Sequence, residues 1–474
     1  MAFVRRNFGL FGKIFGKTEK EAPKLKAKTA AIAQPLAEHK AIEIDWKTPK
    51  IHVSTLKNGL KILTESSGFP AHVHLGAIID IGVREETKEN SGALMGLKHT
   101  YLTKADEIKN FSMLQMSGGE LAMDYDQEQT LFQGYCMSHD VVDYLQLIKT
   151  SLRDERNQED EEKLKIRLEE LWKLREMSLT NEHRLLELTL DVAYGNSGVG
   201  MPLHGSISSK LTLQELNSFE RKLTIPEKTV LFASGVRNHQ EFEDLANQYF
   251  GDLQSTSPYN RVPSPYIGGE HREICATEIT YMSLSFKGAS WTDKDMIALQ
   301  ILKTAIGEAG IFKSGLNLGK GLLTHSYTSF MDKGKYLLGV RCINMNFSDT
   351  GIFGIMLAGV NSHTFNMSND IISEFQNLPN ISDEEISRAK NLLKTQILFL
   401  KEQTGKRLED TAKMYLVLGK TPDELDWMKM IDNVTTDQIR EAARRVTKSK
   451  PTLIVLGTPS QVIPKIEEIA ERVS

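Results

Sequence analysis

The chain contains the same order of predicted elements twice, first near residue 75 and again near residue 280. In both places a strand-like run is followed by a short polar loop and then by an apolar pattern of helical spacing. The helical pattern is "SGALMGLKHTYL" from Ser91 in the first copy and "DMIALQILKTAIG" from Asp295 in the second. Because 474 residues are too many for one ordinary hydrophobic core, two similar modules of about 210 residues each are the simplest explanation.

A change of composition marks the boundary between the two modules. The passage "TSPYNRVPSPYIGGE", residues 256–270, is rich in Pro, Ser and Gly, which is typical of a linker. We therefore expect an N-terminal module at residues 46–262 and a C-terminal module at residues 263–474. Strand-like stretches mix with long, separate helical patterns in each module, and this mixture predicts an α+β fold.

Several turns and helix ends are predicted from short local motifs. The Asn58-Gly59 pair between two β-rich runs predicts a hairpin, and "PTLIVLG" from Pro451 predicts a final strand. The predicted N-caps and capping boxes are Thr292, Ser382 with Glu385, Thr421 with Glu424, and Thr435 with Gln438, and Gly307 is a predicted C-cap.

Residues 1–45 differ from the rest of the chain. The first 17 residues contain four basic side chains and no acid, and Phe8, Phe11, Ile14 and Phe15 recur at helical spacing. Such a basic, acid-free amphipathic start is typical of a mitochondrial targeting segment, here followed by an extension. A helix that binds a membrane surface, or a segment without fixed structure, are the alternatives.

Composition excludes several classes of protein. The net charge of −4 gives no indication of nucleic-acid binding. Cys136, Cys275 and Cys342 are widely spaced, which excludes a zinc ribbon and favours a reducing compartment without a disulfide framework. No apolar run reaches the roughly 18 residues that a membrane span requires.

From Ile51 to the C-terminus, the chain resembles the pitrilysin-type peptidases, or inverted zincins. The passages that carry the resemblance are "LKNGLKILTES" from Leu56, "LGAIIDIGVREETKENSGALMGLKHTYL" from Leu75, "DVAYGNSGVGMPLHGS" from Asp191, and the closing stretch from Ile381 to Gly457. The likeness is to the mitochondrial branch, which contains the processing peptidase and the two core subunits of the cytochrome bc1 complex. It implies two consecutive modules, each a mostly antiparallel sheet flanked by helices.

Active members of this family carry H-x-x-E-H on a helix, where two His bind Zn²⁺ and the Glu takes a proton from the bound water. The corresponding positions here are Met95, Lys98 and His99. A thioether suits Zn²⁺ poorly, and an ammonium group at the position of the base repels the metal and accepts no proton at neutral pH. We therefore expect no catalytic residue, no metal and no cofactor, and an inactive peptidase homologue rather than an enzyme.

Other potential ligands are present but form no comparable pattern. Glu176 stands at the distance that the resemblance gives for a downstream ligand, with Glu169 and Glu170 nearby. A Glu on a charged helix is normally solvated, and this is the interpretation we favour. His72 and His74 would share one face of a strand, but the sequence offers no third ligand near them.

In the α-type members of the branch, which lack the metal, the resemblance implies a glycine-rich loop that helps to hold presequences. The corresponding residues in this chain are Gly307, Gly310, Gly315, Gly319, Lys320 and Gly321. Glu308, Ile311, Phe312 and Lys313 stand where relatives have mostly Gly and small polar residues. These residues reduce the flexibility of the backbone, so peptide binding competes here with a plain surface loop between two helices.

The resemblance implies a non-catalytic core subunit of respiratory complex III, peripheral on the matrix side of the mitochondrial inner membrane. Its expected partners are a β-type core or processing-peptidase subunit, cytochrome b, cytochrome c1 and the iron–sulfur protein, but no nucleic acid. The alternative is an α subunit of the processing peptidase that holds presequence peptides for a zinc-bearing β subunit, and both roles are compatible. Two other hypotheses are a metallopeptidase that uses His99 and Glu176, and a presequence-binding module without a catalytic partner.

Overall fold

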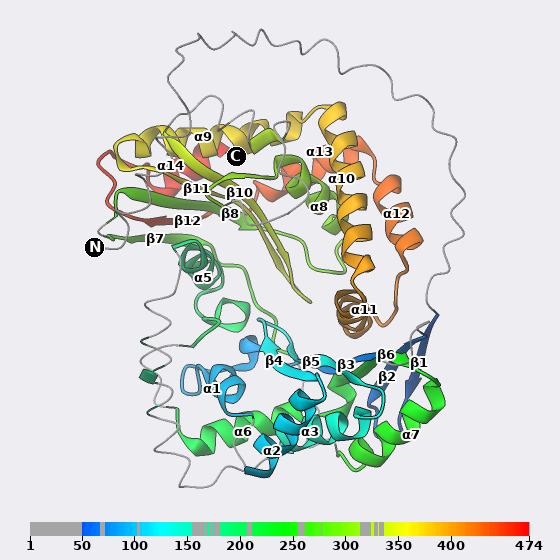
Figure 1. Cartoon of the computed structure of the whole chain (residues 1–474). Coiled ribbons are helices and arrows are strands. Elements are labelled where there is room, and N and C mark those ends of the chain that lie inside the picture. Colours follow the sequence, from blue (N-terminus) through cyan, green and yellow to red (C-terminus); the bar gives the residue numbers. More distant parts are fainter. Residues whose placement is uncertain are drawn as a thin grey trace, which may run out of the picture. The chain divides into compact units, whose positions relative to one another are not determined.

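We analysed a computed structural model of the chain (Figure 1). It describes residues 50–66, 72–101, 105–153, 166, 169–170, 173, 181–205, 211–254, 261–275, 277–312, 324–326, 330 and 336–473, with backbone alone at 66, 100, 105–110 and 153. The predicted targeting segment at 1–45 lies outside the described residues. Residues 49–474 form one unit, so contacts between the two halves of this range belong to the fold.

The N-terminal half contains a six-stranded sheet in the order β1-β2-β6-β3-β5-β4. Its strands are β1 (Ile51–Thr55), β2 (Lys61–Ser66), β3 (His72–Ile79), β4 (Glu120–Tyr125), β5 (Thr130–Met137) and β6 (Thr229–Val236). All neighbouring strands are antiparallel except β2 and β6, which are parallel.

The C-terminal half contains a second six-stranded sheet, in the order β7-β12-β8-β11-β10-β9. Its strands are β7 (Gly269–Glu273), β8 (Ile279–Lys287), β9 (Glu308–Gly310), β10 (Leu337–Asn346), β11 (Gly351–Val360) and β12 (Thr452–Leu456). Here the parallel pair is β7 and β12, and the other neighbours are antiparallel.

The order of the strands shows that the second sheet repeats the first. In each sheet the last strand in sequence, β6 or β12, lies between an antiparallel neighbour and a parallel one. The antiparallel neighbour, β3 or β8, is the strand that precedes the helix of the predicted repeat, and β5 or β11 lies on its other side. The predicted α+β fold of two similar modules, each with a mostly antiparallel sheet, is therefore confirmed.

Helices cover one face of each sheet and enclose a separate hydrophobic core. In the N-terminal module the α-helices are α1 (Ala93–Thr100), α2 (Ala105–Met116), α3 (Val141–Arg153), α5 (Asn181–Tyr194), α6 (Leu213–Leu223) and α7 (His239–Phe250). In the C-terminal module they are α8 (Met296–Ile306), α9 (Thr364–Asn377), α10 (Asp383–Glu402), α11 (Thr404–Leu418), α12 (Glu424–Asn433), α13 (Thr436–Val446) and α14 (Ile466–Val473). No helix among these residues is long and apolar enough to span a bilayer.

Each module also supplies one helix to the second face of the other module's sheet. Helix α5 packs on β12 and β8, where Leu185 joins Ile454 and Leu456 in one buried cluster (Figure 1). Helix α11 packs on β6 and β3, where Leu408 contacts the cluster of Ile78 and its neighbours. Residues of one strand alternate between the two faces, so β3 directs Val73 and Leu75 to one core and Ile78 to the other.

Most of the predicted local motifs are confirmed. The hairpin at Asn58-Gly59 joins β1 to β2, and the capping boxes Ser382 with Glu385 and Thr435 with Gln438 begin α10 and α13. Gly307 ends α8 with a positive φ of 72°, as a C-cap glycine does. The boundaries at residues 45 and 262 stay predictions, since α5 and α11 each lie against the other module's sheet.

Two predicted helix starts are wrong, and both helices begin at a later Asp. Helix α8 begins after Asp295 rather than after Thr292, because the Asp293 carboxylate accepts the backbone N–H of Asp295 in a turn before the helix. Helix α12 begins after Asp423, whose carboxylate accepts the N–H of Asp426 at 2.7 Å, so Thr421 and Glu424 do not form its capping box.

Candidate functional site

The degenerate metal motif lies on α1, whose start is held by a buried carboxylate. Glu86 accepts the backbone N–H groups of Gly92 at 2.7 Å and of Leu94 at 2.8 Å. Burial raises the pKa of Glu86 to about 7, although these hydrogen bonds oppose the shift. Gly92 precedes the helix with a φ of 92°, which favours glycine at this position. Glu86 was not predicted from the sequence.

Met95, which the resemblance places at the first metal-ligand position, is a core residue. Its side chain is only 4% exposed and belongs to the hydrophobic cluster between the sheet and helices α1, α3 and α6. A thioether in this apolar environment packs well and has little tendency to bind Zn²⁺.

Lys98, which the resemblance places at the position of the catalytic base, forms an ion pair with an acid on β4. Its Nζ lies 2.9 Å from Oδ1 of Asp124 and 5.6 Å from the centre of the Tyr125 ring. Burial favours a higher pKa for Asp124, but the hydrogen bond and charge of Lys98 outweigh it and hold this pKa below its ordinary value. Among the described residues, Asp124 is the carboxylate that pairs with Lys98, and this ion pair offsets its charge.

The side chains on this part of α1 do not fit zinc. His99 is half-buried and is the one imidazole among the three motif positions. In the ranges that the structure describes, no three His, Cys, Asp or Glu side chains gather as a metal site would require. Glu169 and Glu170 are exposed, and Glu176 lies outside the described residues. A thioether, an ammonium group and one imidazole cannot hold and activate a zinc-bound water.

His72 and His74 lie on one face of β3, as their spacing predicted. Their ring centres are 4.8 Å apart, and both rings lie near the Tyr135 ring on β5. Burial and the neighbouring His72 lower the pKa of His74, which keeps this imidazole neutral at pH 7. The group is an aromatic cluster, since a neutral Tyr is a poor third ligand.

The start of the glycine-rich passage is a strand rather than the expected surface loop. Glu308–Gly310 forms β9, which pairs with Gly339–Arg341 of β10. Gly310 has a φ of 71°, and a Cβ at this position would lie 2.0 Å from the Leu338 carbonyl oxygen. Phe312 is then buried against Tyr281, with ring centres 6.4 Å apart.

The remaining residues of the predicted peptide-binding loop lie outside the described residues; they are Gly315, Gly319, Lys320 and Gly321. Only Gly307 and Gly310 of the six have a described environment. Both take positive φ angles in the edge of the sheet, at 72° and 71°. At these two positions glycine serves the fold of the sheet edge.

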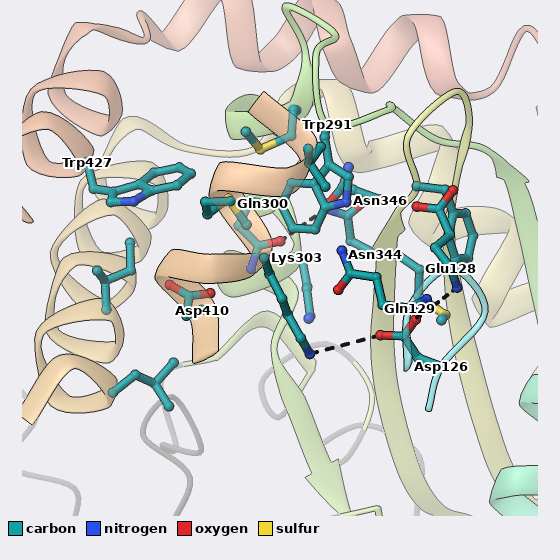
Figure 2. Close-up of a pocket in the computed structure, with 18 of the residues that line it drawn as sticks. Asp126, Glu128, Gln129, Trp291, Gln300, Lys303, Asn344, Asn346, Asp410 and Trp427 are labelled. Carbon is teal, nitrogen blue, oxygen red and sulfur yellow. Dashed lines mark hydrogen bonds and ion pairs between the residues drawn. The ribbon is translucent and has the colours of Figure 1, made fainter. Parts of the chain in front are cut away.

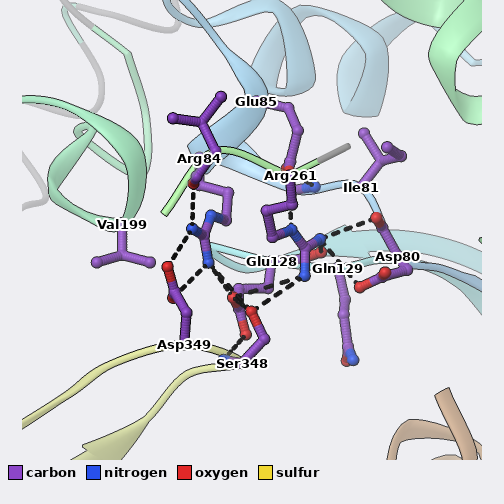
Figure 3. Close-up of polar contacts among 12 residues, drawn as sticks. Asp80, Ile81, Arg84, Glu85, Glu128, Gln129, Val199, Arg261, Ser348 and Asp349 are labelled. Carbon is purple, nitrogen blue, oxygen red and sulfur yellow. Dashed lines mark hydrogen bonds and ion pairs between the residues drawn. The ribbon is translucent and has the colours of Figure 1, made fainter. Parts of the chain in front are cut away.

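A buried group of charges, which we call the polar junction, joins the two modules (Figure 3). It consists of Asp80, Arg84, Glu85 and Glu128 from the N-terminal module, Arg261 from the linker, and Ser348 and Asp349 from the turn between β10 and β11. No residue of this group was predicted from the sequence.

Arg84 is the centre of the polar junction. Its side chain is 1% exposed, and its two terminal nitrogens each lie 3.0 Å from a carboxylate oxygen of Asp349. It also forms an ion pair with Glu128, which accepts the backbone N–H of Ser348 at 2.8 Å. Burial opposes ionisation of Asp349, but Arg84 holds the pKa of this carboxyl below its ordinary value.

Arg261 completes the polar junction from the linker. Its Nε donates to Glu85 Oε1 at 2.9 Å, and its Nη2 lies 2.9 Å from Asp80 Oδ1. These charge-assisted contacts to two carboxylates fix Arg261 on the N-terminal module, whereas the bidentate pair of Arg84 and Asp349 fixes the turn of the C-terminal module there. The linker region is thereby part of the structured contact between modules.

Comparisons with known proteins agree with this fold. A family model described as "Peptidase M16 inactive domain" matches residues 210–393, which run from before α6 into α10. A chain of the structure "Complex III2 from Candida albicans, Inz-5 bound" superposes with a TM-score of 0.74 at 17% identity, covering 90% of this chain and 100% of that one. At this identity the likeness shows the fold.

Sequence relatives extend over nearly the whole chain. The probable mitochondrial-processing peptidase subunit beta of Arabidopsis thaliana is 26% identical over 454 residues, which covers 92% of this chain and 83% of the relative. The subunit beta of Rattus norvegicus is 25% identical over 93% of this chain and 92% of its own length. The subunit alpha of Solanum tuberosum is 25% identical over 90% of this chain and 86% of its own length. Residues 210–393 are thus similar to the inactive domain of the M16 peptidases, and nearly the whole chain is similar to subunits of the mitochondrial processing peptidase.

Proposed function

We propose that the chain is a non-catalytic core subunit, of the core protein 2 type, in mitochondrial respiratory complex III. The observation that carries this proposal is the agreement of the fold with a complex III chain over the whole of that chain and 90% of this one. In this role the protein scaffolds the matrix side of the inner membrane. It pairs with a β-type subunit and contacts cytochrome b, cytochrome c1 and the iron–sulfur protein.

The absence of catalysis is part of the proposal and rests on the motif side chains. Relatives at about 25% identity include both β and α subunits of the processing peptidase, so their names do not discriminate between the two types. The buried Met95 and the ion-paired Lys98 do discriminate, because neither can replace a zinc ligand or a general base. These two residues support an α-type, inactive peptidase homologue.

A second candidate function is that of an α subunit of the mitochondrial processing peptidase. It is favoured by the relatives that cover 90% or more of this chain, which carry that enzyme's name. In this role the chain would hold presequences for a zinc-bearing β subunit. The β9 strand and the buried Phe312 leave less mobile backbone for such a task and therefore favour the structural role.

Native separation of the complexes from mitochondria of the source organism tests the choice between the two functions. After gentle detergent solubilisation, mass spectrometry identifies the band that contains this chain. Co-migration with cytochrome b, cytochrome c1 and the iron–sulfur protein is the expected result, and processing activity in that band would add the second role. A soluble dimer with a zinc-bearing partner would refute the structural role.

Zinc content of purified variants tests the inactive site. After dialysis against micromolar zinc, the wild-type chain is expected to retain less than about 0.1 zinc per chain, since its motif lacks ligands. Met95→His with Lys98→Glu restores H-x-x-E-H and is expected to raise zinc binding at least tenfold over that level. Lys98→Glu alone is the matched control and keeps the thioether. Stoichiometric zinc in the wild type would contradict the inactive assignment.

A further inference from the structure

A pocket of about 490 Å³ lies between the two modules (Figure 2). Residues 126–129 of the N-terminal module form one side, and α8, β10, α10 and α11 of the C-terminal module form the others. Trp291, Trp427, Leu393 and Met414 are among its apolar lining residues. Its volume is within the range of small-molecule sites, roughly 300–1,000 Å³, and its walls combine apolar side chains with polar and charged ones.

Most charged groups around this pocket are already neutralised. Lys401 Nζ lies 2.8 Å from an Asp410 carboxylate oxygen, and Lys413 Nζ lies 3.0 Å from Glu409. Lys413 also approaches Asp126, at 4.0 Å. These cations have their counter-charges within the chain, so none of them requires a ligand.

Lys303 of α8 is the exception among these lysines. Its ammonium group has no ion pair or hydrogen bond in the part of the chain that the structure describes, although the residue lines the pocket. Burial lowers its pKa, which reflects the cost of holding this charge away from water. The charge of Glu308 favours the ammonium form but forms no ion pair with it, so this partly exposed cation is still open to an anion.

Asn344 of β10 places a second unsatisfied group at the same pocket. Its side chain is 8% exposed, and its Nδ2 donates to Gln300 Oε1 at 3.0 Å and to Asn346 Oδ1 at 3.4 Å. Its Oδ1 is buried and accepts no hydrogen bond from a described residue. Buried amide oxygens are rarely left without a donor, so this atom indicates a missing partner.

Lys303 and Asn344 lie on neighbouring elements, helix α8 and strand β10, which pack against each other. Gln300 and Lys303 are three residues apart on α8, hence on one face, and the hydrogen bond of Gln300 ties that face to Asn344. Cys342, two residues before Asn344 on the same strand face, contributes to the electrostatic environment of Lys303. The side-chain amides of Asn344 and Gln300 and the ammonium group of Lys303 therefore lie along one wall of the pocket.

We propose that this pocket binds a small organic acid with an apolar or aromatic body. The carboxylate pairs with Lys303, a hydroxyl or N–H of the ligand donates to Asn344 Oδ1, and the apolar body packs against the walls that contain Trp291 and Trp427. Exchanging the O and N positions of the Asn344 amide would turn a donor toward the ligand's carboxylate instead, so an acid remains the matching ligand in both orientations.

Isothermal titration calorimetry of the full chain with 3-hydroxy-2-naphthoate tests the proposal. This probe combines a carboxylate, a hydroxyl donor and an aromatic body. One molecule is expected to bind per chain, with a dissociation constant below about 100 μM. The neutral analogue 2-naphthol has the same body without the carboxylate and is expected to bind at least tenfold more weakly, because Lys303 then gains no counter-charge.

Two variants locate the binding. Lys303→Met keeps most of the length of the side chain but removes the ammonium group, and should weaken binding of the acid at least tenfold. Lys448→Met is the control, because Lys448 is exposed and lies outside the pocket lining. Val417 is a half-exposed residue of the pocket lining, so Val417→Phe narrows the pocket and leaves Lys303 unchanged. It should weaken the binding of both the acid and 2-naphthol.

Each outcome of these titrations either supports or overturns the proposed site. Saturable binding that is lost with Lys303→Met and Val417→Phe but kept with Lys448→Met would establish the site. No saturable binding of the acid at about 1 mM by the wild type, or binding that changes less than twofold with Lys303→Met, would overturn the proposal. Thermal unfolding of each variant shows whether it is folded. If Lys303→Met does not fold, the effect of Val417→Phe on binding decides whether the pocket is the site.

Discussion

Replacing Arg84 by Met is expected to destabilise the contact between the two modules strongly. Arg84 and Glu128 have side chains that are 1% and 7% exposed, and Asp349 is 26% exposed. Removing one member of a buried ion pair costs about 3–5 kcal/mol, because the other charge stays buried without its partner. Water reaches part of Asp349, and Arg261 stays 3.6 Å from Glu128, so both carboxylates keep some compensation for their charge. We therefore expect the free energy of unfolding to fall by about 3 kcal/mol, the lower end of this range.

Urea unfolding followed by far-UV circular dichroism measures this loss. The matched control is Arg444→Met, which breaks an exposed pair with Glu441, whose side chains are 53% and 45% exposed. Exposed pairs contribute about 0–1 kcal/mol, so the two Arg→Met variants should differ by at least about 2 kcal/mol. Because each module has its own hydrophobic core, Arg84→Met should also separate one unfolding transition into two.

A triple variant checks whether unpaired carboxylates cause the loss of stability. Arg84→Met combined with Glu128→Gln and Asp349→Asn removes the unpaired carboxylates and should regain part of the lost free energy of unfolding. If Arg84→Met unfolds within about 1 kcal/mol of Arg444→Met, the polar junction does not hold the modules together and the reasoning fails.

Three further predictions follow from other buried groups. The pKa of Glu86 in the folded state is about 7, above its ordinary 4.5, so the native state binds a proton more tightly than the unfolded state does. The free energy of unfolding should therefore fall by up to about 3 kcal/mol as pH rises from 4.5 to 7. Glu86→Gln should flatten this pH dependence, which urea unfolding at several pH values measures. His325 lies 2.8 Å from both Glu374 and Glu385, and these carboxylates raise its pKa to about 9. Its stabilisation is therefore present below pH 6.5 and lost as pH rises to 9, and a His325→Gln variant that kept the wild-type slope there would contradict this. Leu408→Ala in α11 should cost about 2–5 kcal/mol in chemical denaturation, because the 1% exposed side chain fills the contact with the N-terminal sheet, whereas the same change at the 60% exposed Leu425 should cost little.

Local interactions explain why much of the fold was predictable. The capping boxes at Ser382 and Thr435, the turn at Asn58-Gly59 and the C-cap at Gly307 each depend on residues within about four positions of one another. The misplaced starts of α8 and α12 come from the same range of sequence, where a later Asp accepted the backbone N–H in place of the predicted Thr. Strand β9 could not be predicted locally, because its pairing with β10 decides that Glu308–Gly310 is extended.

The sequence by itself determined that two similar α+β modules follow one another, and it has Met95 and Lys98 at the positions where the resemblance implies a metal ligand and a base. Residue type alone decides that chemistry. Only the tertiary structure decided how the modules are joined, since Arg84 and Asp349 are 265 residues apart in sequence and meet only when both sheets have formed. The same holds for the pocket at Lys303 and Asn344: its unsatisfied groups become visible only when burial removes water from them, and no local pattern of residues encodes burial.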